Sequence, residues 1–128
     1  QSVPFKPNYS KLGRDLECHR TSVSDLVVLL DKSHLVQILR DDSFGVSSLG
    51  KVDKVYLGNT HLAYALSDTV PDVGNLRETV FLTSVKPVHD IMASSAADFK
   101  VGKYTFEVGG KNKKQKQKLR LMLQLMEV

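Results

Sequence analysis

The stretch Asp98-Phe-Lys-Val-Gly-Lys-Tyr-Thr-Phe-Glu107-Val-Gly-Gly-Lys111 has the pattern of a β-hairpin. The β-branched and aromatic residues that strands prefer lie on both sides of Gly102-Lys103, a two-residue turn candidate. Two antiparallel strands joined by so short a turn end side by side, which brings Asp98 and Glu107 together at the open end. We therefore expect a hairpin over residues 98–108 that presents two acids.

These two acids and the lysine that follows them have the composition of a metal-dependent phosphate site. Two carboxylates at a strand end can hold a divalent cation such as Mg²⁺, and a lysine can steady a nearby phosphate. This arrangement resembles the catalytic motif of nucleases of the PD-(D/E)xK type. The resemblance implies that Asp98 and Glu107 are metal ligands and that Lys111 is the catalytic lysine. Glu78, in an expected helix across the site, would be the additional acid.

The spacing of the motif departs from that of the active nucleases. In those enzymes the second acid and the lysine are two residues apart and leave the same face of one strand. Here Gly109-Gly110 makes the separation four residues, and paired glycines usually end or bulge a strand. The alternative is that Asp98 and Glu107 are solvated hairpin residues and that Glu78 is an ordinary helix-surface charge. Between these readings, we expect a vestigial site.

Four phrases distributed along the chain are distinctive: Lys54-Val-Tyr-Leu-Gly-Asn59, Leu62-Ala-Tyr-Ala-Leu66, Asn75-Leu-Arg-Glu-Thr79 and Tyr104-Thr-Phe-Glu-Val-Gly-Gly-Lys-Asn-Lys113. Together they resemble the C-terminal region of a family of prokaryotic AAA+-type ATPases, over roughly residues 7–116. In that family a nuclease-like domain of unassigned function follows an ATPase module and a winged helix. The resemblance implies a fold and a parent protein, and it does not by itself imply a reaction.

The N-terminal third has the periodicity of two helices. A first helix is expected over residues 7–17, and a second over residues 23–33 after a break at 18–20. Thr21 or Ser22 is the capping candidate of the second helix. Its buried face is expected to carry four apolar side chains, namely Val23, Leu26, Val27 and Leu30.

A strand over residues 35–40, a loop over 41–50 and a return strand over 54–57 are expected to follow. Two helices at a short turn followed by a hairpin predict a winged helix-turn-helix over residues 1–57, and the family resemblance implies the same unit. Residues 58–128 would form the second domain. Its expected elements are a short helix over 61–66 and a helix from Asn75 that buries Leu76, Val80 and Phe81. The predicted fold class is α+β: a winged helix-turn-helix and a small, truncated PD-(D/E)xK-nuclease-like α/β unit.

Two groups of residues are candidates for contact with DNA. The first opens the second helix, where a guanidinium and hydroxyls can meet phosphates or base edges: Arg20, Thr21, Ser22 and Ser24. The second is a lysine block, in which residues 111–128 hold six basic side chains and one acidic side chain. Its DNA-binding candidates are Lys113, Lys114, Lys116 and Lys118. The alternative for the block is a solvated surface.

The chain ends with Leu119-Arg-Leu-Met-Leu-Gln-Leu-Met-Glu-Val128, which departs from the family pattern. Either a helix or a strand here would expose apolar side chains, which suggests a covering partner such as a second copy of the chain. Because this segment replaces further strands of the family, we expect the nuclease-like half to be incomplete.

The composition limits the remaining function classes. The chain has 128 residues, 41% of them hydrophobic and 25% charged, as in a globular protein. Its one cysteine, Cys18, excludes an internal disulfide and fits a reducing cytoplasm. No apolar run approaches the roughly 20 residues that span a bilayer, so no membrane partner is expected. Because the chain begins at Gln1 with no signal segment, we expect it to be a piece of something longer.

Two functions follow as expectations. The first is a binding and assembly module of an AAA+-type ATPase, in which the absent N-terminal module uses ATP. This chain has no G-x-x-x-x-G-K-[ST] loop with which to bind ATP itself. The second is a Mg²⁺-dependent nuclease that uses Asp98, Glu107 and Lys111. The glycine insertion and the altered C-terminus favour the binding module.

Overall fold

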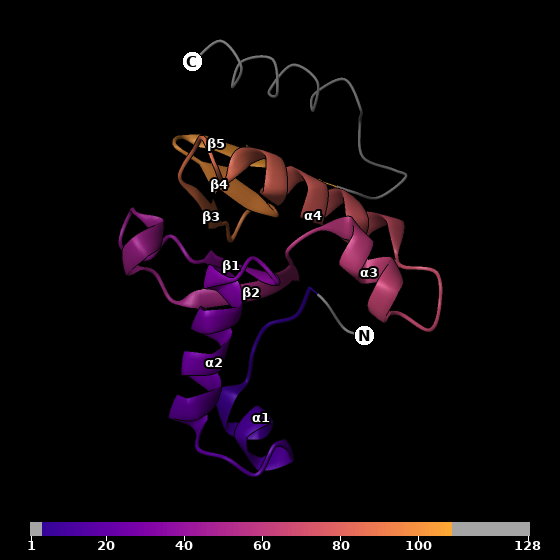
Figure 1. Cartoon of the computed structure of the whole chain (residues 1–128). Coiled ribbons are helices and arrows are strands. Elements are labelled where there is room, and N and C mark those ends of the chain that lie inside the picture. The colour runs from indigo at the N-terminus through magenta and orange to yellow at the C-terminus, as the bar shows by residue number, and fades with distance from the viewer. Residues whose placement is uncertain (1–3, 109–128) are drawn as a thin grey trace.

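The computed structural model of the chain describes residues 4–108. They form an α+β fold of helices and two small antiparallel sheets (Figure 1). In chain order the elements are α1 (Tyr9–Asp15), α2 (Arg20–Lys32), β1 (Val36–Arg40), the 3-10 helix η1 (Ser47–Leu49), β2 (Val52–Leu57), α3 (Thr60–Leu66), α4 (Val73–Val85), β3 (Ile91–Ala93), β4 (Phe99–Val101) and β5 (Tyr104–Phe106).

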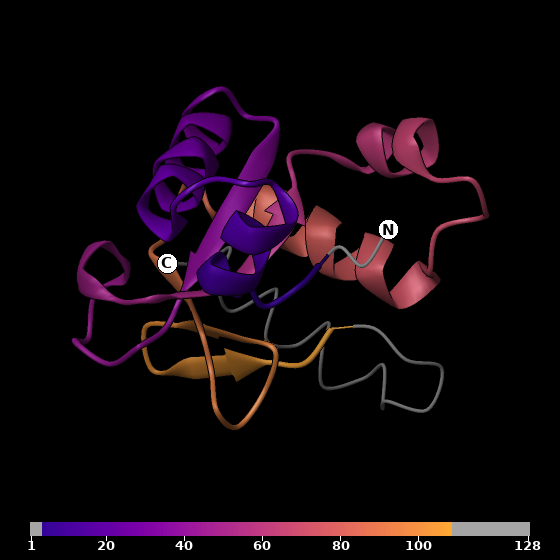
Figure 2. The same cartoon turned by 90° about the horizontal axis from the view of Figure 1, so that it is seen from below.

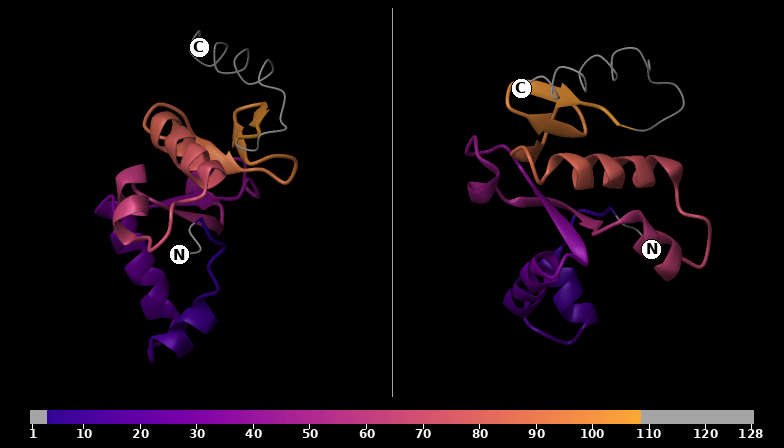
Figure 3. Two further views of the ribbon diagram at one scale, coloured as in Figure 1. Left: turned by 90° about the vertical axis from the view of Figure 1, so that its right-hand side faces the viewer. Right: turned by 45° about the horizontal axis from the view of Figure 1, so that its top comes forward.

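The β1–β2 hairpin is the middle layer of the molecule, with α1 and α2 on one side and α4 and β3–β5 on the other (Figures 1 and 3). Ile38 pairs with Val55, and both pack with Val27 of α2. Their chain neighbours Leu39 and Tyr56 point to the opposite face, because side chains alternate along a strand, and are fully buried in the larger core. That core therefore contains residues from both of the expected domains, 1–57 and 58–128.

The first two helices are close to their expected positions. Asn8 caps α1, where its Oδ1 accepts a hydrogen bond of 3.0 Å from the backbone N–H of Lys11. α2 begins at Arg20, with His19 at the N-cap position, so the prediction that Thr21 or Ser22 caps this helix is wrong. The turn between the helices is tight because Gly13 lies against it: a Cβ there would be 2.7 Å from the carbonyl oxygen of Cys18.

An extended segment before α1 adds to the first sheet. Phe5 forms an antiparallel bridge with Val55, in which its N–H donates to the Val55 oxygen at 3.2 Å and its oxygen accepts from the Val55 N–H at 2.9 Å. The hairpin was expected from the sequence, whereas this bridge was not. It places the N-terminal segment beside β2 and on the side of that strand away from β1.

The helices of the second half begin at side-chain caps. Asn59 caps α3, and Asp72 caps α4, which begins at Val73, two residues before the expected start at Asn75. Phe81 is buried as predicted, but Val80 is 53% exposed and Leu82 is fully buried in its place. The same kind of error affects α2, where Leu26 is 47% exposed.

The second sheet has the order β3-β4-β5. The predicted hairpin is confirmed: Phe99 pairs with Phe106 and Val101 with Tyr104, around a turn in which Gly102 has a φ of +58°. Stacking of Phe81 on Phe99, with ring centroids 5.0 Å apart, fixes this sheet to α4. The strand β3, which the sequence did not indicate, pairs with β4 on its other side.

Candidate functional site

Asp98 and Glu107 lie at matching ends of the second hairpin, as the sequence predicted. Asp98 directly precedes β4 and Glu107 directly follows β5, next to the paired residues Phe99 and Phe106. The Oδ2 atom of Asp98 accepts a hydrogen bond of 2.6 Å from the backbone N–H of Val108. Asp98 is partly buried and Glu107 is exposed. The Asp98 carboxylate therefore closes the open end of the hairpin, whatever else it binds.

Glu78, the third acid of the expected site, faces the core from the middle of α4. Its Oε2 atom accepts a hydrogen bond of 2.8 Å from the hydroxyl of Tyr56, which is fully buried. The Tyr56 ring lies 6.0 Å from the ring of Phe99, measured between centroids. Glu78 is therefore not an ordinary surface charge. It joins α4 to β2 beside the second hairpin.

This arrangement changes the pKa of the Tyr56 hydroxyl. Burial raises the pKa of Tyr56 well above its ordinary value, and the hydrogen bond to Glu78 and the Glu78 charge add to the increase. The charges of Asp98 and Asp53 contribute in the same direction. Tyr56 thus remains a neutral hydrogen-bond donor, next to a negatively charged part of the molecule.

The described residues do not gather the three acids into a metal cluster. Between residues 4 and 108, no group of three or more His, Cys, Asp or Glu side chains is placed to hold a metal ion. Glu78, Asp98 and Glu107 therefore do not form such a group. Lys111, the proposed catalytic lysine, lies outside the described residues. What the structure provides is one pair of strand-end acids and one acid bound to a buried phenol.

The DNA-binding candidates of the N-terminal half share the first turns of α2 (Arg20–Lys32). Arg20, Thr21 and Ser22 are exposed, and Ser24 is partly buried. A shallow hollow adjoins them at the α1–α2 turn and is lined by residues that include Arg14, His19 and Arg20. The remaining candidates, Lys113, Lys114, Lys116 and Lys118, lie outside the described residues.

A feature that the sequence interpretation missed is the apolar character of the open side of α2. Leu29 is 61% exposed and Leu26, one turn before it, 47%. We call these two side chains the α2 leucine face. Residues 26–30 are all apolar, and no single helix face can bury five consecutive residues, so the signal was present in the sequence.

Comparison with known proteins identifies no relative. No protein-family model matches the chain, and no curated protein or solved structure is significantly similar to it. The resemblance to the C-terminal region of AAA+-type ATPases therefore remains an expectation from the sequence. Among the helices of residues 4–108, none has the length and apolar content needed to cross a membrane.

Proposed function

We propose that this chain is a non-catalytic binding and assembly module, the C-terminal part of an AAA+-type ATPase. The observation that carries the proposal is the α2 leucine face, because adjacent exposed leucines on a helix mark a surface for protein contact. Leu16, at the end of α1, and Leu35, just after α2, are also about half exposed or more, at 58% and 49%. The α1–α2 part of the molecule thus exposes four leucine side chains.

The charge of α2 favours a protein partner over DNA. Arg20 and Lys32 are balanced on this helix by Asp25 and Asp31, so α2 carries no net charge. Helices that read DNA usually belong to markedly positive surfaces, because phosphate neutralisation supplies much of the affinity. We therefore assign Arg20, Thr21, Ser22 and Ser24 a secondary role, in which they contact phosphates weakly if DNA is present.

The chain order supports a winged helix as the framework of this module. An extended segment at Phe5, two helices and the β1–β2 hairpin follow one another, and the first segment pairs with the last strand. Winged helices have this order after their first helix, and they serve in protein contacts as well as in DNA binding. Either use is compatible with a parent ATPase whose ATP-binding module lies elsewhere.

The competing function, a PD-(D/E)xK-type nuclease, is favoured by one observation: Asp98 and Glu107 adjoin paired strand ends. Against it, Glu78 is engaged with Tyr56, and the described residues hold no three-ligand metal group. We therefore propose that any nuclease-like half is vestigial, and the metal and cleavage experiment in the Discussion separates the two functions.

The assembly role is tested by sedimentation of the intact chain over micromolar to submillimolar concentrations. We expect self-association that the double variant Leu26→Ser, Leu29→Ser weakens at least about tenfold, equivalent to about 1.4 kcal/mol. The matched control is Val80→Ser with Val88→Ser, which removes two exposed valines elsewhere. A chain that stays monomeric, and that binds duplex DNA tightly through Arg20, would contradict the proposal.

The ATPase part of the proposal has its own test. Sequencing the gene upstream of the codon for Gln1 should find a G-x-x-x-x-G-K-[ST] phosphate loop in the same reading frame. If the reading frame continues upstream without such a motif, the parent protein is not an ATPase of this kind. That outcome would leave the α2 leucine face and its test unaffected.

A further inference from the structure

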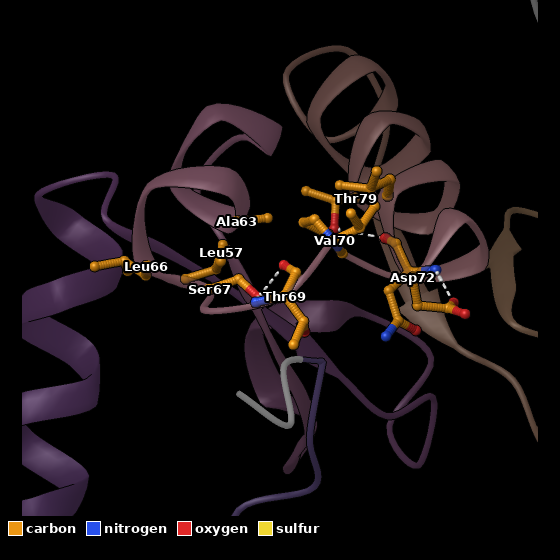
Figure 4. A pocket seen from close by; sticks show the side chains of 11 residues that line it. Leu57, Ala63, Leu66, Ser67, Thr69, Val70, Asp72 and Thr79 are labelled. Carbon is orange, nitrogen blue, oxygen red and sulfur yellow. Dashed lines mark hydrogen bonds between the residues drawn. The ribbon is translucent and has the colours of Figure 1, made fainter.

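A second apolar surface lies between α3 and α4, away from the α2 leucine face. Seen from below, α3 and the loop to α4 lie to one side of α1 and α2 (Figure 2). Between them is a groove of about 370 Å³, which we call the α3–α4 groove (Figure 4). Its apolar lining comes from β2, α3, the connecting loop and α4: Leu57, Ala63, Leu66, Val70 and Leu76.

Two apolar side chains of the groove lining are highly exposed: Val70 at 85% and Leu66 at 65%. Val73, next to the lining residue Asp72, is also 56% exposed. Single exposed apolar residues are common on protein surfaces, but several that meet at one concave site indicate a covering segment.

The charge around the groove is negative. The segment from Thr60 to Asp72 contains two acids, Asp68 and Asp72, and no lysine or arginine. Asp72 also caps α4, where its Oδ1 accepts a hydrogen bond of 3.0 Å from the N–H of Asn75. An occupant that brings basic side chains beside apolar ones would therefore suit both the lining and the rim.

We propose that the occupant is this chain's own segment Leu119–Val128, with the preceding lysines passing over Asp68 and Asp72. The segment lies outside the described residues, and its composition suits the groove. It carries leucine or methionine at six positions: 119, 121, 122, 123, 125 and 126. Five lysines stand directly before it, between residues 111 and 118. The order of basic and apolar residues matches the acidic rim and the apolar groove.

The length of the chain permits this contact. Val108, the last described residue, packs against the core cluster that contains Phe81 and Leu82 of α4. Ten residues lie between Val108 and Leu119, and the eleven steps along the chain can span at most about 36–40 Å, whereas α4 is only about 20 Å long. A tethered segment is also present at an effective concentration of order millimolar, so even a weak affinity keeps the groove occupied.

The proposal is tested by disulfide formation in the intact chain. Cys18, the only cysteine, is first replaced by serine, and cysteines are then introduced by Val70→Cys and Leu123→Cys. The matched control combines Leu123→Cys with Val88→Cys, because Val88 is also highly exposed, at 70%, but lies beyond the other end of α4. In dilute solution we expect the Val70 pair to close at least about tenfold faster, as a docking preference of about 1.4 kcal/mol requires.

Further variants separate the contributions of charge and apolar contact. Replacing Lys113, Lys114, Lys116 and Lys118 by glutamine should reduce the preference for the Val70 position more at low salt than at high salt. Leu121→Asp with Leu125→Asp should abolish it. Equal closure rates at Val70 and Val88 would overturn the proposal. Disulfide-linked dimers as the main product would also overturn it, since the groove would then hold the segment of a second copy.

Discussion

The hydroxyl of Tyr56 donates a hydrogen bond of 2.8 Å to Oε2 of Glu78, and this contact joins β2 to α4. Tyr56 has no exposed surface, and its ring lies beside Phe99 of the second hairpin. The bond therefore sits where the first hairpin, α4 and the second sheet meet. An acid that the sequence offers as a catalytic helper has a structural partner in the core.

Loss of this contact should destabilise the fold. Glu78→Ala removes the acceptor of a buried hydroxyl and should lower the free energy of unfolding by about 1–3 kcal/mol, and Tyr56→Phe by about 1 kcal/mol. Urea unfolding followed by circular dichroism measures both. Tyr64→Phe is the control, because Tyr64 is 59% exposed and its variant should stay within about 0.5 kcal/mol. Equal stability of the Tyr56 and Tyr64 variants would show that the bond contributes nothing.

Alkaline pH should weaken the fold through the same residue. The pKa of Tyr56 is raised above the ordinary value of 10.0, so the folded state keeps its phenol protonated where the unfolded chain would ionise. This contribution to stability is complete below about pH 10 and is lost as the pH rises beyond it. Tyr56→Phe should therefore flatten the decline of unfolding free energy above pH 10. Tyr9→Phe should flatten it less, because the Arg40 charge opposes the rise in the pKa of Tyr9.

The end of the β1–β2 hairpin leaves no space for a side chain at Gly58. A Cβ there would lie 1.8 Å from the carbonyl oxygen of His34, whose own backbone has a φ of +63°. Gly58→Ala should therefore force the strand ends apart and cost about 1–3 kcal/mol, measured by thermal or urea unfolding. Gly74→Ala, in the first turn of α4, is the control. It should cost less than Gly58→Ala, because its Cβ would lie 3.0 Å from a single side-chain oxygen, the capping Oδ1 of Asp72, and because alanine favours the helix over glycine.

Local sequence patterns were sufficient for the elements whose contacts are local. The second hairpin was predictable because Gly102-Lys103 supplies the turn and strand-forming residues flank it. The strand Ile91–Ala93 was not, because three residues give no periodicity and its partner β4 follows an intervening loop. Val80 was misplaced for a related reason. α4 has apolar residues on several sides, and only its packing on Phe99 and Phe106 selects Phe81 and Leu82 as the buried ones.

In the candidate site, too, the local arrangement was predictable from the sequence and the long-range contact was not. The proximity of Asp98 and Glu107 follows from the register of one hairpin, which the sequence specifies. The contact between Tyr56 and Glu78 joins residues 22 positions apart, and it depends on how α4 crosses the first hairpin. No spacing rule gives that crossing. The sequence analysis therefore selected Glu78 as a candidate residue but did not predict its hydrogen bond with Tyr56.

The lysine block should bind duplex DNA weakly and in a salt-dependent way. Each phosphate that a lysine neutralises releases counterions, and the logarithmic salt slope changes by about 0.9 per contact. Replacing Lys113, Lys114, Lys116 and Lys118 by glutamine should lower both the affinity and the slope in a fluorescence anisotropy titration. The control removes four exposed lysines from elsewhere on the chain: Lys11, Lys32, Lys51 and Lys103. Equal losses in the two variants would assign DNA binding to net charge alone.

A divalent cation should stabilise the chain modestly without making it a nuclease. Asp98 and Glu107 stand at neighbouring strand ends, and a hard cation on their oxygens would relieve the repulsion between them. Mg²⁺ or Mn²⁺ should therefore raise the melting temperature slightly, as binding to the folded state alone requires. Asp98→Asn should abolish this increase while keeping an acceptor oxygen for the N–H of Val108. Asp25→Asn, a change at an exposed acid, should leave it intact.

The same preparations should show no cleavage of plasmid or linear DNA, with or without the metal. The inserted Gly109-Gly110 places Lys111 four positions after Glu107, whereas the active nucleases have two. We therefore expect the lysine to be too far from the cation to assist attack on a phosphate. Among the described residues, no third His, Cys, Asp or Glu joins these two acids in a group that could position that cation. Metal-dependent cutting that Asp98→Ala or Glu107→Ala abolishes would establish the nuclease and overturn the binding-module proposal. If no metal changes the melting temperature, the two acids are surface residues that serve only the hairpin.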